Sequence, residues 1–308
     1  MSSPHKLQPG IISVLQTPFD RAGQFDKESM TRLVNDSINA GVNGFLVPAV
    51  ASEVAALTAE ERFLIVRHVA AVTAQRVPII LEASANEVSQ CQAFAPLAEE
   101  IDAAAWLVAV PEKIYGQPAD LVSFFAEISR TTTTPLLIQD LQWNGPGLTV
   151  SQLEQLQAAV PTLIGVKIET VPAGPKYTQV REHFGDDFFI AGGWAVPQWI
   201  EALDRGVDAM IPESSMIPVY AAILSDYQAG NRDRALARFR RLVPLLTFTN
   251  QEIGLSIAFF KRLLVRRGIF NEETMRPPLF HWDEYNSRIA EELIELYFEL
   301  EQEFGIKA

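Results

Sequence analysis

The sequence predicts an α/β fold, a (β/α)₈ TIM barrel followed by a C-terminal helical extension, and three observations predict it. Short apolar segments rich in β-branched residues alternate with segments of helical periodicity. Eight such strand-like segments occur, and eight βα units close into a barrel. From about Val219 onward the pattern is helical alone. Strands that alternate with helices pair in parallel through crossover connections, so these observations favour a barrel.

The predicted strands are apolar on both faces, which is typical of parallel strands covered by helices. They span residues 10–16, 44–49, 78–83, 106–110, 135–140, 163–169, 188–191 and 209–212. A doubly wound open sheet is the competing arrangement, and it usually has a glycine-rich phosphate-binding turn after its first strand. The segment QTPF, which starts at Gln16 at the end of the first predicted strand, is not such a turn.

Helices are predicted between the strands from their apolar periodicity. They span residues 27–40, 59–74, 87–99, 121–131, 151–159, 177–184 and 196–205. Capping chemistry supports two of their starts. Thr58 opens a capping box with Glu61, and Thr149 with Ser151 can cap the helix predicted at 151–159.

The change of pattern near the C-terminus predicts two parts of the chain. Residues 1–225 are expected to form the catalytic barrel, and residues 226–308 a helical extension. One predicted helix of the extension carries a basic run, Lys261-Arg262 and Arg266-Arg267. We expect this run to form a solvated or subunit-facing surface.

Composition and charge narrow the class of protein. The chain has 308 residues, 48% of them hydrophobic, and a formal net charge of −13, which argues against a nucleic acid or an anionic membrane surface as partner. Neither a secretory signal nor a run long enough to cross a bilayer is visible. Cys91 is the single cysteine, which fits a reducing cytoplasm. The four histidines lack metal-ligand spacing, so no metal site is expected.

The segment LIGVKIET, from Leu163, places a lysine in a strand that should be buried. Side chains alternate between the faces of a strand, so Lys167 and Glu169 share the face that points into the barrel. Glu169 lies at the carboxyl end of the strand, where active sites of this fold are found. Burial disfavours a charged amine, and an uncharged amine can attack a carbonyl to form a Schiff base. A structural ion pair between Lys167 and Glu169 or another carboxylate is the alternative interpretation.

Four motifs in the same order make the chain resemble a known family. They are TPF from Thr17, LTAEER from Leu57, GVK from Gly165 and AGG from Ala191. Together they resemble the pyruvate-dependent class I aldolases and dehydratases, the dihydrodipicolinate synthase and N-acetylneuraminate lyase family. The resemblance covers essentially the whole chain. It implies a Schiff-base lysine at Lys167. Gly192 and Gly193 allow close approach of backbone to ligand, and the alternative is that they only make the turn after the seventh strand.

Two departures from the family pattern bear on the reaction. The family usually has Gly-Thr-Thr-Gly-Glu after its second strand, whereas this chain has Ala49, Val50, Ala51, Ser52 and Glu53. The backbone amides of Val50 and Ala51 could still bind a substrate carboxylate, with Ser52 as the remaining hydroxyl and Glu53 as the family carboxylate. On the fifth strand Gln139 replaces the family's proton-shuttling tyrosine, and glutamine has no titratable proton. The arginine of dihydrodipicolinate synthases has no clear match near Asn144.

One branch of the family matches better. IQD on the fifth strand, KIET on the sixth, SE after the second and GNRDRALARFRRLVPLL from Gly230 resemble L-2-keto-3-deoxyarabonate dehydratases. The resemblance implies a lyase that removes water from a 2-keto-3-deoxy sugar acid, with catalytic Lys167, Glu169 and Gln139. It implies no separate cofactor, because the substrate itself forms the Schiff base, and a homotetramer or homodimer. Trp143 and Trp194 could shape the distal end of the pocket.

Three alternatives remain open at this point. The chain could be an aldolase that releases pyruvate, or a condensing enzyme like dihydrodipicolinate synthase. It could also be a family member that binds a keto acid without turning it over, because the tyrosine and the threonines are absent. Purely structural roles also stay open: Glu169 could only pair with Lys167, Gln139 could fill the barrel end, and Ser52 could cap the next turn.

Overall fold

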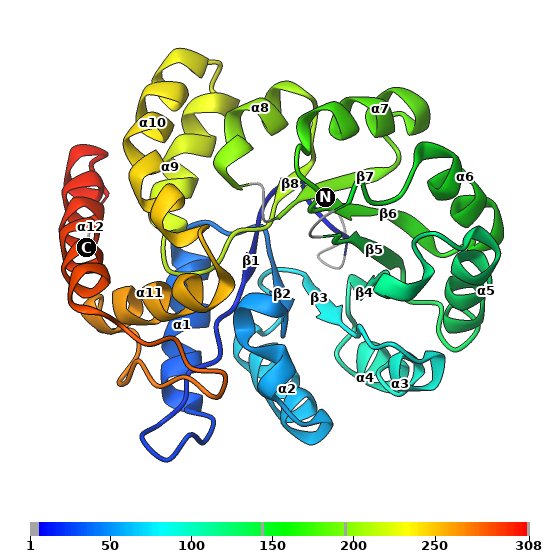
Figure 1. Cartoon of the computed structure of the whole chain (residues 1–308), viewed down its shortest axis with the longest axis horizontal. Helices are drawn as coiled ribbons and strands as arrows, with labels where there is room; N and C mark the ends of the chain where they lie inside the picture. Colours follow the sequence, from blue (N-terminus) through cyan, green and yellow to red (C-terminus); the bar gives the residue numbers. More distant parts are fainter. Residues whose placement is uncertain (1–5, 143–144, 194–195, 307–308) are drawn as a thin grey trace. The chain divides into compact units, whose positions relative to one another are not determined.

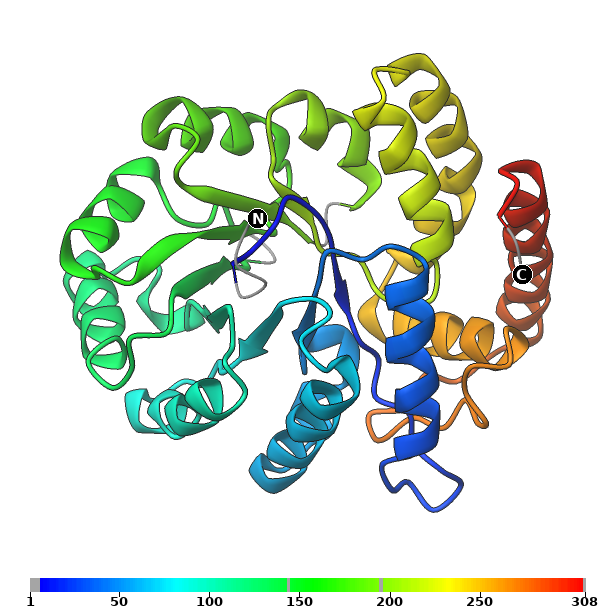
Figure 2. The ribbon, with the colours of Figure 1, turned by 180° about the vertical axis from the view of Figure 1, so that it is seen from behind.

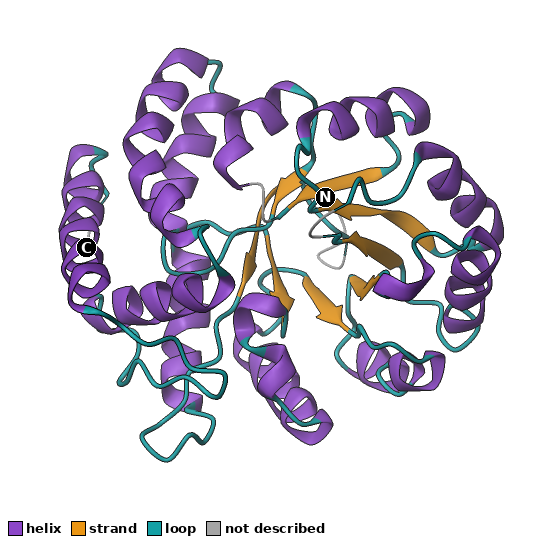
Figure 3. Cartoon of the chain, in the orientation of Figure 1, coloured by secondary structure: helices purple, strands orange, loops and turns teal. Residues whose placement is uncertain are grey.

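The computed structural model describes residues 6–142, 145–193 and 196–306. Eight parallel strands form a closed barrel in chain order, from β1 to β8 (Figures 1 and 3). They are β1 Gly10–Val14, β2 Gly44–Val47, β3 Ile79–Glu82, β4 Ala105–Ala109, β5 Leu136–Asp140, β6 Leu163–Ile168, β7 Phe189–Gly192 and β8 Ala209–Met210. The predicted fold class is therefore confirmed.

Each strand is almost wholly buried, which explains why the sequence shows continuous apolar runs rather than alternation. The register between β5 and β6 is the one that matters for the site. Gln139 lies opposite Lys167, and Asp140 lies opposite Ile168. Because side chains alternate along a strand, Gln139 and Lys167 point to the same face.

The helices between the strands begin and end close to their predicted bounds. They are α1 Lys27–Asn39, α2 Ala59–Thr73, α3 Val88–Gln92, α4 Ala95–Glu100, α5 Pro118–Ile128, α6 Val150–Ala159, α7 Gly174–Phe184 and α8 Trp199–Asp204. Thr58 and Glu61 form the predicted capping box of α2. Thr149 caps α6 as predicted, with Gln152 rather than Ser151 completing the box.

Two predictions of single helices were wrong. The segment predicted at 87–99 is divided into α3 and α4, and Pro96 lies in the first turn of α4. A proline is tolerated in a first turn but breaks a helix interior, so the break precedes it. The segment predicted at 196–205 starts as a 3₁₀ turn, η4 Val196–Gln198, before α8 begins at Trp199.

The chain forms two compact units. One comprises residues 77–211 with the described residues before position 11, and contains β3 to β8 with the helices α3 to α8. Figures 1 and 2 show these helices on the outside of their strands. Buried aromatic side chains such as Trp106 and Phe125 fill this unit.

The other unit comprises residues 11–76 and 212–306. It contains most of β1, together with β2, α1, α2 and the C-terminal helices. These last helices are α9 Ile217–Gln228, α10 Arg232–Thr249, α11 Ile253–Arg266 and α12 Glu284–Glu303. Helix α10 packs against α9, α11 and α12. Residue 225 lies inside α9, and the domain boundary expected there stays a prediction. Across the described ranges, no helix is both long enough and apolar enough to cross a membrane.

Candidate active site

Lys167 is buried in β6, and its amine contacts a carboxylate. Its side chain is 4% exposed, and Nζ lies 3.0 Å from Oε2 of Glu169, itself 8% exposed. The ion pair offered by the sequence as the alternative interpretation is therefore formed. An ion pair does not exclude nucleophilic chemistry, because a carboxylate within hydrogen-bond distance of an amine can also accept its proton.

The carboxylate of Glu169 also binds Gln139. Gln139 Nε2 donates to Glu169 Oε2 across the β5–β6 pair, and the glutamine is 3% exposed. The backbone N–H of Glu169 donates to Asp140 O at 3.0 Å, which fixes the end of β6 against β5. The three residues predicted to be catalytic thus lie together, with the carboxylate between the amine and the amide.

Gly193 follows β7 and lies beside this cluster. A Cβ atom there would collide with Glu169 Oε1 and lie 2.6 Å from Cε of Lys167. Gly192 faces other neighbours, because a Cβ atom there would meet the Tyr177 hydroxyl and lie 2.9 Å from Sδ of Met210. The missing side chain at Gly193 therefore makes room for the lysine and the carboxylate. Trp143 and Trp194 lie outside the described residues.

For the imine that the sequence predicts at Lys167, we expect Gly193→Ala to lower the rate of formation by at least about tenfold, because the new methyl group must displace the Glu169 carboxylate or the Lys167 side chain. The rate of borohydride-trapped adduct formation measures this effect. Gly185→Ala is not a matched control, since Gly185 has a positive φ; Gly116→Ala is, because a Cβ atom there meets nothing within 4 Å. A normal rate in Gly193→Ala would contradict the expectation.

The loop after β2 consists of two short 3₁₀ turns, η1 Val50–Ser52 and η2 Val54–Ala56. The Ser52 hydroxyl is already engaged: Oγ donates to Leu15 O at 2.5 Å and accepts from Ala49 N at 3.0 Å. Thr17 Oγ1 donates to Ser52 O at 2.8 Å. The hydroxyls thus shape the loop. Val50 and Ala51 open the turn, where backbone N–H groups have no acceptor within the helix.

Glu53 lies between the two turns, and its carboxylate pairs with Lys261 of α11. From the sequence, we expected the basic run containing Lys261 to form a solvated or subunit-facing surface. For Lys261 this was wrong, because its side chain is fully buried. The helical period explains the error: consecutive residues of a helix point in different directions, so adjacent charges need not share a surface.

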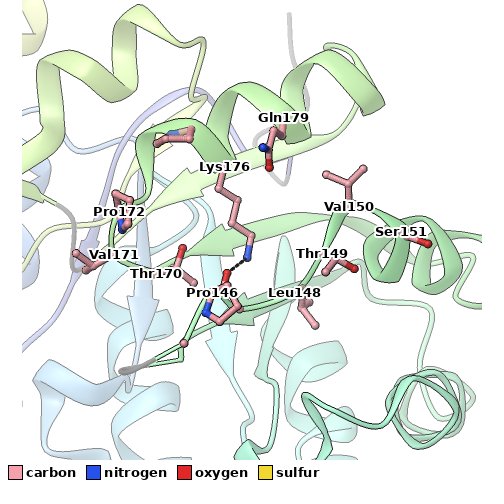
Figure 4. A pocket seen from close by; sticks show the side chains of 13 residues that line it. Pro146, Leu148, Thr149, Val150, Ser151, Thr170, Val171, Pro172, Lys176 and Gln179 are labelled. Carbon is pink, nitrogen blue, oxygen red and sulfur yellow. Dashed lines mark hydrogen bonds between the residues drawn. The ribbon is translucent and has the colours of Figure 1, made fainter.

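A second buried pair, which sequence reasoning missed, lies at the end of β5. Lys176, in the first turn of α7, contacts Asp140 and donates to Pro146 O at 2.9 Å (Figure 4). Leu148 N donates to Asp140 Oδ1 at 3.0 Å. Burial raises the pKa of Asp140 and lowers that of Lys176, and each partner opposes the shift of the other. The motif IQD, which contains Asp140, was visible in the sequence, but it gave no indication that Lys176 would be the partner of Asp140.

Lys176 also lines the cavity shown in Figure 4. Its volume is about 960 Å³, and its walls come from residues 145–151, 170–172 and the first turns of α7. Asp140 and Thr170 lie so close to Gly147 that a Cβ atom there would collide with both, Thr170 Cγ2 at 2.5 Å. Asp140 and Thr170 therefore leave no room for a side chain at Gly147.

Comparison with known proteins decides the family. The sequence profile of the dihydrodipicolinate synthetase family matches residues 7–296. The chain belongs to this family. The resemblance found from the four motifs is confirmed.

Curated relatives of this chain carry the names of different enzymes. An L-2-keto-3-deoxyarabonate dehydratase of Azospirillum brasilense is 28% identical over 276 residues, which cover 88% of each chain. A 4-hydroxy-tetrahydrodipicolinate synthase of Brucella abortus is 30% identical over 244 residues, which cover 77% of this chain and 81% of the synthase.

Solved structures of other enzymes share the fold. A sialic acid aldolase of Ruminococcus gnavus superposes with a TM-score of 0.89 at 19% identity, covering 97% of this chain and all of that one. A 4-hydroxy-tetrahydrodipicolinate synthase of Methylacidiphilum fumariolicum superposes with a TM-score of 0.87 at 21% identity, covering 97% and 99%. At these identities the likeness extends to the fold alone.

Proposed function

We propose that this protein is a Schiff-base lyase that removes water from a 2-keto-3-deoxy sugar acid. The observation that carries the proposal is the buried amine of Lys167, 3.0 Å from the Glu169 carboxylate at the carboxyl end of a barrel strand. Membership of the family supports the lyase class. The dehydratase of Azospirillum brasilense supports the choice of water as the leaving group.

Lys167 is the proposed nucleophile, and the imine that it forms with the substrate accepts electrons during the reaction. Its neutral amine attacks C2 of the keto acid, a carbon–nitrogen bond forms, and the ketone oxygen leaves as water. The protonated imine withdraws electrons from C3, so a base can take a C3 proton to give an enamine. The enamine expels the hydroxyl group at C4, which leaves as water once it is protonated. Hydrolysis of the imine restores the lysine, and no separate cofactor is needed.

Glu169 is the proposed base. Its Oε2 lies 3.0 Å from Nζ, so in the free enzyme it can accept a proton from the ammonium group. In the proposed complex the same carboxylate would take the proton from C3, the carbon next to the imine carbon. Gln139 holds this carboxylate through its amide N–H. Since an amide has no titratable proton, Gln139 orients Glu169 rather than carrying protons itself.

The substrate carboxylate is assigned to the loop after β2. Because the Ser52 hydroxyl donates to Leu15 O, the assignment rests on the amides of Val50 and Ala51. The role of Gly192 and Gly193 in binding substrate also stays a prediction, as do a homodimeric or homotetrameric assembly and a cytoplasmic location.

An aldolase that releases pyruvate is the second candidate. The same imine and enamine serve carbon–carbon cleavage, and one of the solved structures with this fold is a sialic acid aldolase. Replacement of the tyrosine by Gln139 favours dehydration, since the loss of that acid–base group removes the family's usual proton shuttle.

Borohydride reduction in the presence of pyruvate, followed by intact mass and peptide mapping, tests the Schiff base. We expect one pyruvyl adduct per chain, on Lys167. Keto-deoxy acids of five and six carbons are then incubated with the enzyme. An α-keto product that keeps every carbon supports the dehydratase, whereas pyruvate among the products supports the aldolase. If no 2-keto acid gives an adduct, the role of Lys167 is limited to its structural ion pair with Glu169.

A further inference from the structure

A buried ion pair joins the loop after β2 to helix α11 within the second unit. Lys261 is 0% exposed, its Nζ contacts the carboxylate of Glu53, and it donates to Thr274 O at 2.7 Å. Nζ also lies 4.5 Å from the centre of the Phe19 ring, a favourable distance for a cation over an aromatic face. A buried ammonium is unfavourable unless such partners surround it. Among these partners of Lys261, Glu53 supplies the negative charge.

Glu53 is held on both sides. Its Oε2 accepts from the backbone N–H of Arg276 at 2.8 Å, and the Arg276 guanidinium binds Glu61 of α2 at 2.6 Å and Gly23 O at 2.7 Å. Glu53 has a φ of +59°, in the left-handed region that side chains other than glycine seldom adopt. This residue ends η1 and starts η2, so its conformation sets the direction of both turns.

The charge of Lys261 persists at neutral pH. Burial lowers the pKa of Lys261 to about 8, and the opposite charge of Glu53 limits that shift. The lysine is therefore mostly protonated at pH 7, and the attraction between the two side chains remains.

We propose that Lys261 and Glu53 are positioning residues for substrate binding, which fix η1 so that the amides of Val50 and Ala51 receive the carboxylate of the keto acid. This inference rests on the proposed function. In this proposal, helix α11 contributes to substrate binding, because its Lys261 holds the loop after β2 through one ion pair with Glu53. The expected defect is a loss of affinity with little change in the chemical step, because the pair acts on the loop and not on the reacting carbons.

Trapping with borohydride over a range of pyruvate concentrations tests the proposal on the full-length protein. We expect Lys261→Met and Glu53→Gln to raise the half-saturating pyruvate concentration by at least about tenfold, with the same adduct per chain at saturation. Hydrogen exchange of the amides at positions 50–56 should become faster in both variants. The double variant Glu53→Gln/Lys261→Met leaves no unpaired buried charge, so it keeps the test usable if a single variant does not fold.

Arg266→Met is the matched control. Arg266 is a cation of the same helix, but it pairs at the surface with Glu291 and Glu295 of α12. Half-saturation and loop exchange should stay as in the wild type. An unchanged half-saturation in the folded Lys261 and Glu53 variants overturns the proposal, and so does an equal loss in Arg266→Met. A wild-type protein that forms no adduct is a different outcome, since it overturns the proposed function first.

Discussion

Lys167→Ala is expected to abolish the adduct and to lower turnover of the keto-deoxy acid by at least about a thousandfold, because no other group can replace a covalent nucleophile. Lys167 is buried and lies in a strand, beside a carboxylate that can take its proton. Intact mass after borohydride reduction measures the adduct, and the appearance of the α-keto product measures turnover. Both should be lost together.

The variant must be compared with a lysine that shares none of these features. Lys113 is 62% exposed and pairs with Glu87 at the surface, so Lys113→Ala should keep full adduct and turnover. Loss of activity through unfolding is separated by the thermal transition. Gln139 still binds the Glu169 carboxylate in Lys167→Ala, which limits the destabilisation. Turnover that survived in a folded Lys167→Ala protein would show that the reaction does not pass through this amine.

The strands and the contact between Lys167 and Glu169 could be predicted because their signals are local. A parallel strand buried on both faces must be a continuous apolar run, and each of the eight was recognised from that property. Lys167 and Glu169 stood out because they interrupt such a run on one face. Their mutual contact followed from the alternation of side chains along one strand.

Partners from distant segments could not be predicted in this way. Lys176 meets Asp140 because the chain between β5 and α7 returns to the end of β5, and Lys261 meets Glu53 because α11 packs against η1. Neither contact can be predicted from the periodicity of a single helix or strand. A lysine on a helix is usually solvated, so the sequence favoured the surface for Lys261. The division of residues 87–99 into α3 and α4 is different, since Pro96 was a local signal that could have been used.

Lys176→Met is expected to lower the free energy of unfolding by about 3–5 kcal/mol, the usual effect of removing one partner of a buried ion pair. Asp140 is 0% exposed, and Lys176 is the cation that offsets its burial. Without the lysine, the pKa of Asp140, already raised by burial, should rise further. Chemical denaturation at a series of pH values measures the effect.

The pH dependence has a definite sign. A carboxyl group whose pKa is higher in the folded than in the unfolded protein binds more protons when folded, so the variant loses stability as the pH rises through that pKa. The deficit of Lys176→Met should therefore be largest at neutral pH and shrink as the solution is acidified. Asp140→Asn/Lys176→Met should recover most of the loss, since an amide needs no counter-charge and its oxygen can still accept from Leu148 N. A deficit independent of pH, shared by the double variant, would mean that Lys176 stabilises the fold by packing its hydrocarbon chain, and that the strand ends beside Gln139 and Glu169 do not depend on this charge pair.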